Sequence, residues 1–181
     1  MKVHGWSMRD AGIADGDELV VDRGVAAEDG RIVIADIDGE LTVKRLSLAD
    51  AQLILDGCQK KAVEVGTPKD MAVVDESGHL IAFRRMDGAK FSSVEIAINK
   101  AFTSSGGGRA TRDDKTIAGA GGAAFGLHTQ FQGRFTILGG GVPVVVDGQI
   151  VGAVGISSGA ADEDHAVAEA GIAAFMATQK G

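Results

Sequence analysis

The hydrophobic period of this 181-residue chain changes at Ser47, and this change limits the folds that the chain can adopt. Before Ser47, short apolar runs alternate with turn residues, and they lie at 18–22, 31–35 and 40–44. Asp29-Gly30 and Asp38-Gly39 separate these runs, and an Asp-Gly pair between β-branched runs is a strong hairpin signal. The pattern predicts an antiparallel β-meander over residues 19–46.

The sequence after Ser47 has a helical period. Ser47 is followed three residues later by Asp50, which is typical of a helix N-terminus. Apolar residues then recur at helical spacing as far as Ala62, and Gly66 provides a C-terminal stop. We therefore expect a helix from Ser47 to Gly66.

The remaining segments alternate between strand and helix patterns. Strands are predicted at 71–75, 80–84, 135–138, 142–146 and 149–156, with Asp147-Gly148 as the hairpin turn between the last two. Helices are predicted at 92–104 and 162–177, and a short helix is expected near Asp113. The glycine-rich stretch 105–126 suits either a binding loop or a mobile connection. Helices around a mainly antiparallel sheet indicate the α+β class.

Charge and composition argue against several classes of partner. The net charge is −7, and the chain has eight aromatic residues and no tyrosine, so it offers neither a basic surface for phosphates nor a set of rings for base stacking. Nucleic acid is therefore not an expected partner. No apolar run reaches the roughly 18 residues of a membrane helix, and no signal-peptide pattern opens the chain. The lone cysteine, Cys58, excludes an internal disulfide, and it falls inside a predicted helix, where we expect it to pack. We expect a cytoplasmic protein without a membrane partner.

The first 46 residues resemble the N-terminal half of the S24 peptidase domain of the LexA/UmuD family. The resemblance rests on Gly-Trp-Ser-Met at 5–8, on residues 11–22 and on residues 38–46. It implies that Ser7 is the nucleophile and Lys44 its base, a pairing that requires a lysine pKa low enough to leave a neutral amine. The family's aspartate before the serine is Trp6 here, and a helix replaces the family's later strands. We therefore expect an inactive β segment, packed onto the rest of the chain or onto another subunit.

Residues 47–181 resemble the GlcG/HbpS/PduO C-terminal family, also described as haem-degrading or DUF336. The matching stretches are 48–52, 72–80, 83–89, 93–101, 138–143 and 151–157. The resemblance implies a profilin-like antiparallel sheet flanked by helices, to which the N-terminal β-meander is added. It also implies a homo-oligomer and, as in several family members, binding of haem or a related tetrapyrrole. Two domains are expected, 1–46 and 47–181.

Five residues are candidates for cofactor binding in the second part. His128 has apolar neighbours and a glycine-rich approach, whereas His79 falls in a predicted hairpin turn, where a solvated polar residue is the simpler interpretation. Thr103 and Thr111 are included because the family resemblance implies weak oxygen ligands to haem, and Lys100 because it lies in a matching stretch. Ordinary capping and turn bonds are the alternative for both threonines.

Three other features have open interpretations. Gly139-Gly140-Gly141 requires either unusual backbone angles or a close neighbour, which is equally explained by a ligand or by a subunit contact. Residues 104–108, with Arg109 and Arg112, suit either an anion site or a solvated loop. His165, in the first turn of the last predicted helix, is expected at the surface.

Three functional hypotheses follow. The first is a small-molecule-binding protein, with haem as the possible cofactor. The second, from another class, is a Ser7/Lys44 hydrolase that cleaves itself or a partner. The third is a structural assembly protein without a ligand.

Overall fold

The computed structural model describes Glu18, residues 36–37 and 40–41, and residues 46–179. The chain divides into two units, Met1–Arg45 and Leu46–Gly181. In the first, β1 (Asp36–Ile37) pairs with β2 (Glu40–Leu41) in an antiparallel register, as a hairpin at 38–39 requires. Ser7, Lys44 and the predicted strands 18–22 and 31–35 lie outside the described residues, except for Glu18. The peptidase-like role of that segment and its packing stay predictions.

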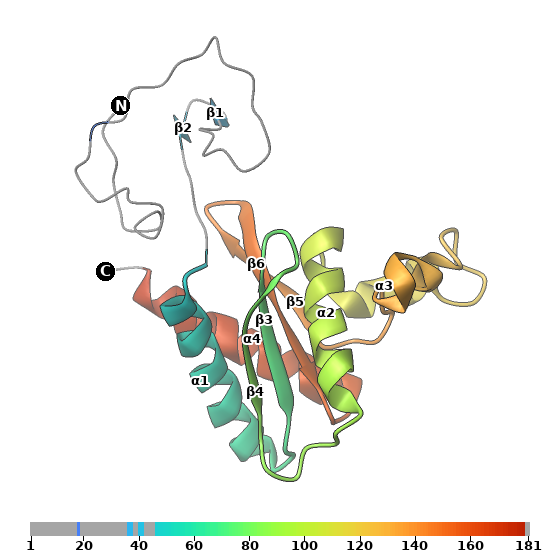
Figure 1. Cartoon of the computed structure of the whole chain (residues 1–181), viewed down its shortest axis with the longest axis horizontal. Helices are drawn as coiled ribbons and strands as arrows, with labels where there is room; N and C mark the ends of the chain where they lie inside the picture. Colours follow the sequence, from blue (N-terminus) through green and yellow to red (C-terminus); the bar gives the residue numbers. More distant parts are fainter. Residues whose placement is uncertain (1–17, 19–35, 38–39, 42–45, 180–181) are drawn as a thin grey trace. The chain divides into compact units, whose positions relative to one another are not determined.

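The second unit is a four-stranded antiparallel sheet between helices (Figure 1). The strand order is β4-β3-β6-β5, and the strands are β3 (Asp70–Asp75), β4 (Leu80–Arg85), β5 (Gly141–Val146) and β6 (Gln149–Ser157). One face packs against α1 (Leu48–Val65) and α4 (Ala161–Thr178), and the other packs against α2 (Ser93–Gly107). This arrangement confirms the α+β prediction.

Local sequence signals account for the first helix. The Ser47 hydroxyl accepts a hydrogen bond from the Asp50 amide at 3.1 Å, and the Asp50 carboxylate accepts one from the Ser47 amide at 2.9 Å. This reciprocal capping box satisfies two amides that have no partner within the helix. At the other end Gly66 adopts φ +77°, and its amide donates to the carbonyls of Ala62 and Val63. The predicted limits of this helix are confirmed.

The hairpin prediction is also confirmed for β5 and β6. Their turn residues Asp147 and Gly148 have φ values of +49° and +77°, so both lie in the left-handed region that a two-residue hairpin loop requires. Strand β3 is buried along its whole length because it lies between two strands and has helices on both faces. A central strand of this kind has no solvent-facing side.

The prediction of a strand at 135–138 is wrong. This segment forms no ladder with the sheet, because its backbone bonds to side chains of the helical layer instead. The Thr136 amide donates to the Thr103 hydroxyl at 2.9 Å, and the Leu138 carbonyl accepts from the Thr111 hydroxyl at 2.7 Å. The apolar run resembles a strand, but its polar backbone groups have other partners.

The glycine-rich stretch 105–126 contains helical structure that the sequence pattern only partly indicated. Helix α2 continues through Gly107 and ends at Gly108, which has φ +67°. Helix α3 (Thr111–Ala118) follows, in agreement with the short helix expected near Asp113. Two 3₁₀ turns, η2 (Leu127–Thr129) and η3 (Phe131–Gly133), then lead towards β5.

Among the described residues, no helix is both long enough and apolar enough to cross a membrane.

Candidate functional site

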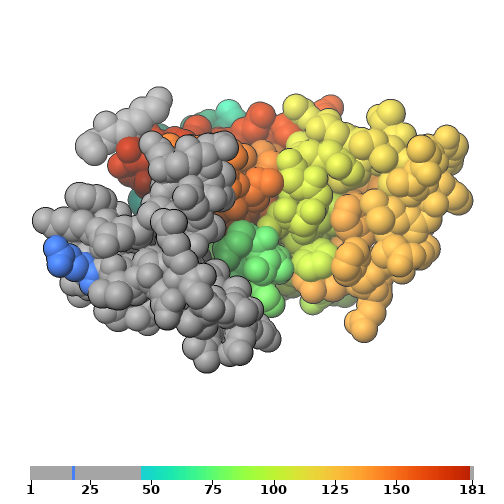
Figure 2. Space-filling view, turned by 90° about the horizontal axis from the view of Figure 1, so that it is seen from above, coloured from blue at the N-terminus to red at the C-terminus, as the bar shows by residue number. Residues whose placement is uncertain are grey.

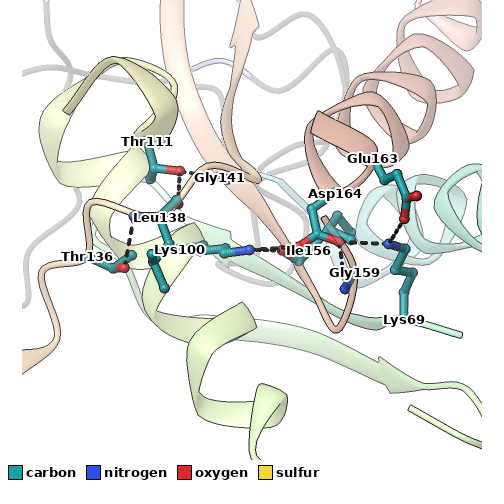
Figure 3. A network of polar contacts seen from close by, with 10 residues as sticks. All are labelled: Lys69, Lys100, Thr111, Thr136, Leu138, Gly141, Ile156, Gly159, Glu163 and Asp164. Atoms are coloured by element: carbon teal, nitrogen blue, oxygen red, sulfur yellow. Dashed lines mark hydrogen bonds and ion pairs between the residues drawn. The ribbon is translucent and has the colours of Figure 1, made fainter. Parts of the chain in front are cut away.

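A buried network of charges joins α2, the start of β3 and the first turn of α4 (Figure 3). Lys69 Nζ donates to Asp164 Oδ1 at 2.8 Å and to Glu163 Oε2 at 3.2 Å. Lys100 Nζ donates to Asp164 Oδ2 at 2.9 Å and to the Ile156 carbonyl at 2.7 Å. Asp164 therefore lies between two lysines, and all three of these side chains are buried.

Burial and ion pairing have opposite effects on these charges. Desolvation lowers the pKa of Lys100, because the charged ammonium loses water, and the Asp164 carboxylate opposes that shift. The hydrogen bond from Lys69 lowers the pKa of Glu163. Each ammonium has carboxylate or carbonyl partners. In this arrangement Lys100, a predicted cofactor residue, has its amine bonded inside the protein.

The triple glycine is explained by contacts within the chain. Gly140 has φ +120°, and a Cβ there would lie 2.7 Å from the Ile156 carbonyl oxygen and 2.8 Å from Asp164 Cβ. A Cβ on Gly141 would collide with the Lys100 carbonyl. The backbone must pass this close for the chain to enter β5 beside the buried network. Neither a ligand nor a subunit is needed to explain these glycines.

The two candidate threonines are fully buried and bonded to the main chain. The Thr103 hydroxyl donates to the Asn99 carbonyl at 2.7 Å and accepts from the Thr136 amide at 2.9 Å. The Thr111 hydroxyl donates to the Leu138 carbonyl at 2.7 Å and accepts from the Gly141 amide at 2.9 Å. Both hydroxyls hold residues 136–141 against the helices.

His128 has a different environment, in the α3–β5 connection, which we define as residues 119–140. Figure 1 shows this connection and α3 on the side of α2 away from the sheet, and Figure 2 shows them, yellow to orange, at one end of the second unit. The Nδ1 atom of His128 is buried and has no hydrogen-bond partner among the described residues. Its ring contacts Phe125 edge-on, with 5.8 Å between centroids, and Phe125 is 66% exposed.

An aromatic cluster fixes the other end of the connection to α2. The Phe131 ring lies 5.7 Å from that of Phe102 and 6.3 Å from that of Phe135. The Arg134 guanidinium lies 3.9 Å above the Phe102 ring, which is cation–π geometry. Phe131 is nevertheless 61% exposed. The connection therefore presents two aromatic side chains to solvent, one before and one after His128 in the chain.

The structure does not group the other candidates with His128. His79 lies in the β3–β4 turn, its side chain is 80% exposed, and its Nδ1 is 3.5 Å from Asp75 Oδ2. The predicted surface position of His165 is wrong: this residue is buried on α4, and its Nε2 lies 3.1 Å from Glu169 Oε1. Ala161 and Asp162 at the α4 N-terminus are exposed, but Asp164 and His165, one turn into the helix, are buried.

Residues 104–109 do not form the exposed anion cradle that was one interpretation of the sequence. The Ser104 hydroxyl donates to the Arg109 carbonyl, and the Ser105 hydroxyl donates to the Asp75 and Glu76 carbonyls. The Arg109 side chain pairs with Asp114. The polar side chains of this stretch are therefore hydrogen-bonded within the protein.

Sequence reasoning missed Lys69 and Asp164. A signal for Asp164 was available, because this residue lies at helical spacing from Val167, Ala168 and Gly171 and so shares their apolar face. An acid on an apolar face requires a buried cation. No pattern indicated that Lys69, almost a hundred residues away, is one of its partners.

Known proteins resemble the second unit over most of its length. An uncharacterised 15.0 kDa protein of Citrobacter freundii, from the dhaT-dhaS intergenic region, is 33% identical over 74% of this chain and 94% of its own length. Protein GlcG of Escherichia coli is 39% identical over 62% of this chain and 81% of its own. The corrinoid adenosyltransferase PduO of Salmonella typhimurium is 31% identical over 75% of this chain and 40% of its own.

Solved structures share the fold. The Klebsiella pneumoniae protein ORFY superposes with a TM-score of 0.73, at 33% identity, over 78% of this chain and 97% of its own. The PduOC–haem complex gives a TM-score of 0.69, at 31% identity, over 72% of this chain and 94% of its own. The GlcG/HbpS-like architecture implied by the sequence is thereby confirmed.

The two ends of the chain match different family models. Residues 1–56 match Peptidase S24-like, and the LexA repressor of Bordetella pertussis is 49% identical over 30% of this chain and 26% of its own length. Residues 46–173 match the model described as haem degrading protein HbpS-like, which spans more than half of the chain. The chain therefore belongs to the HbpS-like family and carries an S24-like segment at its N-terminal end.

Proposed function

We propose that this protein binds haem or a related tetrapyrrole at the α3–β5 connection, with His128 as the iron ligand. The observation that carries the proposal is the imidazole of His128, which forms no hydrogen bond among the described residues although its Nδ1 is buried. A buried polar atom without a partner costs free energy and calls for an explanation. The HbpS-like family and the PduOC–haem complex favour haem as that explanation.

The residues around His128 have the chemistry that a tetrapyrrole requires. Imidazole is a common axial ligand of haem iron. Phe125 and Phe131 are exposed and offer apolar surface to a flat macrocycle. Bound haem would supply a redox-active iron, whereas these side chains would hold and shield it.

Cations on α3 suit the carboxylates of the same ligand. Arg112 and Lys115 are exposed and lie three residues apart, so they share one face of the helix. Their charges would favour haem propionates, and Arg109 is already paired with Asp114. The proposed site thus draws on apolar surface of the connection and on positive charge of α3, the helix that precedes it.

The N-terminal segment is proposed to have no peptidase activity. The S24-like match ends at residue 56, and its last residues form the first half of α1. Ala51, Ile54 and Leu55 of that helix are buried in the core of the second unit. These residues therefore form part of the core of the HbpS-like fold. This supports a structural role for the N-terminal segment rather than an active Ser7/Lys44 dyad.

Titration of the purified protein with hemin tests the proposed function. The wild type is expected to give a saturable Soret shift, and His128→Ala is expected to weaken hemin binding by about tenfold or more, as loss of an axial ligand requires. His79→Ala is the matched control, because His79 is exposed and lies in the β3–β4 turn. It should bind hemin like the wild type.

Two results would contradict the proposal. The absence of any saturable Soret change in the wild type would exclude tetrapyrrole binding and favour a structural protein. Equal hemin affinity of wild type and His128→Ala would exclude this imidazole as the ligand. Self-association, which the family resemblance implies, stays a prediction that light scattering of the purified protein can test.

A further inference from the structure

The buried hydroxyl groups of two threonines help to set where the α3–β5 connection rejoins the sheet. The connection leaves α3 at Gly119 and returns to β5 at Gly141. Along residues 134–139 it pairs with no strand of the described sheet, and the Gly140 carbonyl then accepts from the Ile156 amide of β6 at 2.9 Å. The hydroxyls of Thr103 and Thr111 also hold this return path (Figure 3 shows the contacts of Thr111).

Each hydroxyl uses both its proton and a lone pair on the backbone. Thr103 links the carbonyl of Asn99, one turn back on α2, to the amide of Thr136. Thr111 bridges the carbonyl of Leu138 and the amide of Gly141. Both side chains are fully buried. A hydroxyl in this position cannot reach a ligand in solvent unless the connection first moves away.

The contacts continue from these threonines towards His128. Thr136 adjoins the buried Phe135, whose ring stacks on Phe131 at 6.3 Å between centroids. Phe131 belongs to η3, which follows the η2 turn that carries His128. The path therefore runs from Thr103 through packed aromatic rings to the segment that holds the imidazole.

The backbone of this segment is strained, so it needs such anchors. Phe131 and Gln132 have φ values of +51° and +59°, in the left-handed region that residues other than glycine seldom occupy. Two such residues in succession persist only when the surrounding contacts hold them. The threonine bonds and the Phe102–Phe131 contact supply these restraints.

We propose that Thr103 and Thr111 are positioning residues for the tetrapyrrole site: through the backbone of residues 136–141 they set the conformation that presents His128 and its flanking phenylalanines. This inference rests on the proposed function. It differs from a direct role, because both hydroxyls are buried and already bonded to backbone groups. Among the five candidate cofactor residues, it assigns ligand contact to His128 and a positioning role to Thr103 and Thr111.

The experiment compares isosteric and hydroxyl-retaining variants of the full chain. Thr103→Val and Thr111→Val keep the side-chain shape and lose the hydroxyl, whereas Thr103→Ser and Thr111→Ser keep the hydroxyl. The valine variants should bind hemin about five- to tenfold more weakly, as the loss of a loop hydrogen bond predicts, with an unchanged Soret maximum in the bound form. The serine variants should bind within about twofold of the wild type. Thr116→Val, at an exposed site on α3, is the matched control.

A second measurement does not depend on hemin. Amide hydrogen exchange at Thr136 and Gly141, and tryptic cleavage after Arg134, should both be faster in the valine variants than in the serine variants. Faster exchange in the valine variants, combined with a wild type that fails to bind hemin, would refute the proposed function and leave the anchoring role in place. Unchanged hemin affinity and exchange in both valine variants would overturn the positioning role, and a shifted Soret maximum would show direct ligation instead.

Discussion

Lys100 Nζ lies 2.9 Å from Asp164 Oδ2, and this buried ion pair joins α2 to the first turn of α4 next to the Ile156 carbonyl, near the end of β6. The other carboxylate oxygen accepts from Lys69 at 2.8 Å. One aspartate thus compensates two buried ammonium groups, with help from Glu163. The relationship explains why glycine is required at 140, where the main chain passes the pair.

Asp164→Ala should destabilise the fold by about 3–5 kcal/mol. Removing the carboxylate leaves Lys69 and Lys100 buried without their main partner, and an uncompensated buried charge is far more costly than the loss of the pair itself. Asp87→Ala, which removes an exposed carboxylate from a turn, should change the free energy of unfolding by about 0.5 kcal/mol or less. Urea denaturation of the three proteins measures both values. Similar midpoints for Asp164→Ala and the wild type would mean that the network contributes little.

Gly140→Ala should cost about 2–5 kcal/mol, because it adds a steric collision to an unfavourable backbone angle. The new methyl group would press on the Ile156 carbonyl and on Asp164. Gly121→Ala is the control: Gly121 also has positive φ, at +82°, but its Cβ would enter open space, so only about 1 kcal/mol should be lost. Equal losses in the two variants, measured by thermal or urea unfolding, would show that contact with the network is not what constrains Gly140.

Asp70 should give the unfolding free energy a distinct pH dependence. Both of its carboxylate oxygens are buried without a hydrogen bond, and Arg85 Nε is 3.9 Å away, so desolvation raises the pKa of Asp70 above 3.8 despite the opposing arginine. The folded protein therefore holds this proton to higher pH than the unfolded chain does. The stabilising contribution is complete below pH 3.8 and is lost as the pH rises through the folded-state pKa.

Comparison with Asp70→Asn isolates this group. The free energy of unfolding of the wild type minus that of the variant should fall as the pH rises from about 3.5 to 7, with a slope no steeper than about 1.4 kcal/mol per pH unit, since one proton is involved. Urea denaturation across this range provides the measurement. A difference that is constant, or that grows with pH, would refute the raised pKa.

Several features of this chain were readable from local sequence. The capping pair Ser47 and Asp50, the stop at Gly66 and the Asp147-Gly148 turn were all predicted correctly. Each depends on contacts within a few residues, so the sequence contains the whole interaction. Cys58 was also correctly expected to pack: it is fully buried, and desolvation raises the pKa of its thiol to about 12. The helical spacing of its neighbours gave that position directly.

Other features depended on residues that are distant in the chain. Residues 135–138 have a strand-like pattern, but Thr103 and Thr111 take up their backbone groups, so no strand forms. His165 was expected at the surface, but it lies on the buried side of α4 with Asp164 and Ala168. The partners of Asp164 lie 64 and 95 residues away.

The sequence by itself therefore determined the fold class, the limits of the first helix, the Asp147-Gly148 turn and the resemblance to two families. Only the tertiary structure decided which polar side chains are buried together and which remain available, because burial depends on how separate elements pack. Lys100, Thr103 and Thr111 are bonded within the protein, whereas the His128 imidazole has no hydrogen-bond partner among the residues that the structure describes. The hydrophobic periodicity indicates on which face of a helix or strand a residue lies. The tertiary structure determines which distant residues it contacts on that face.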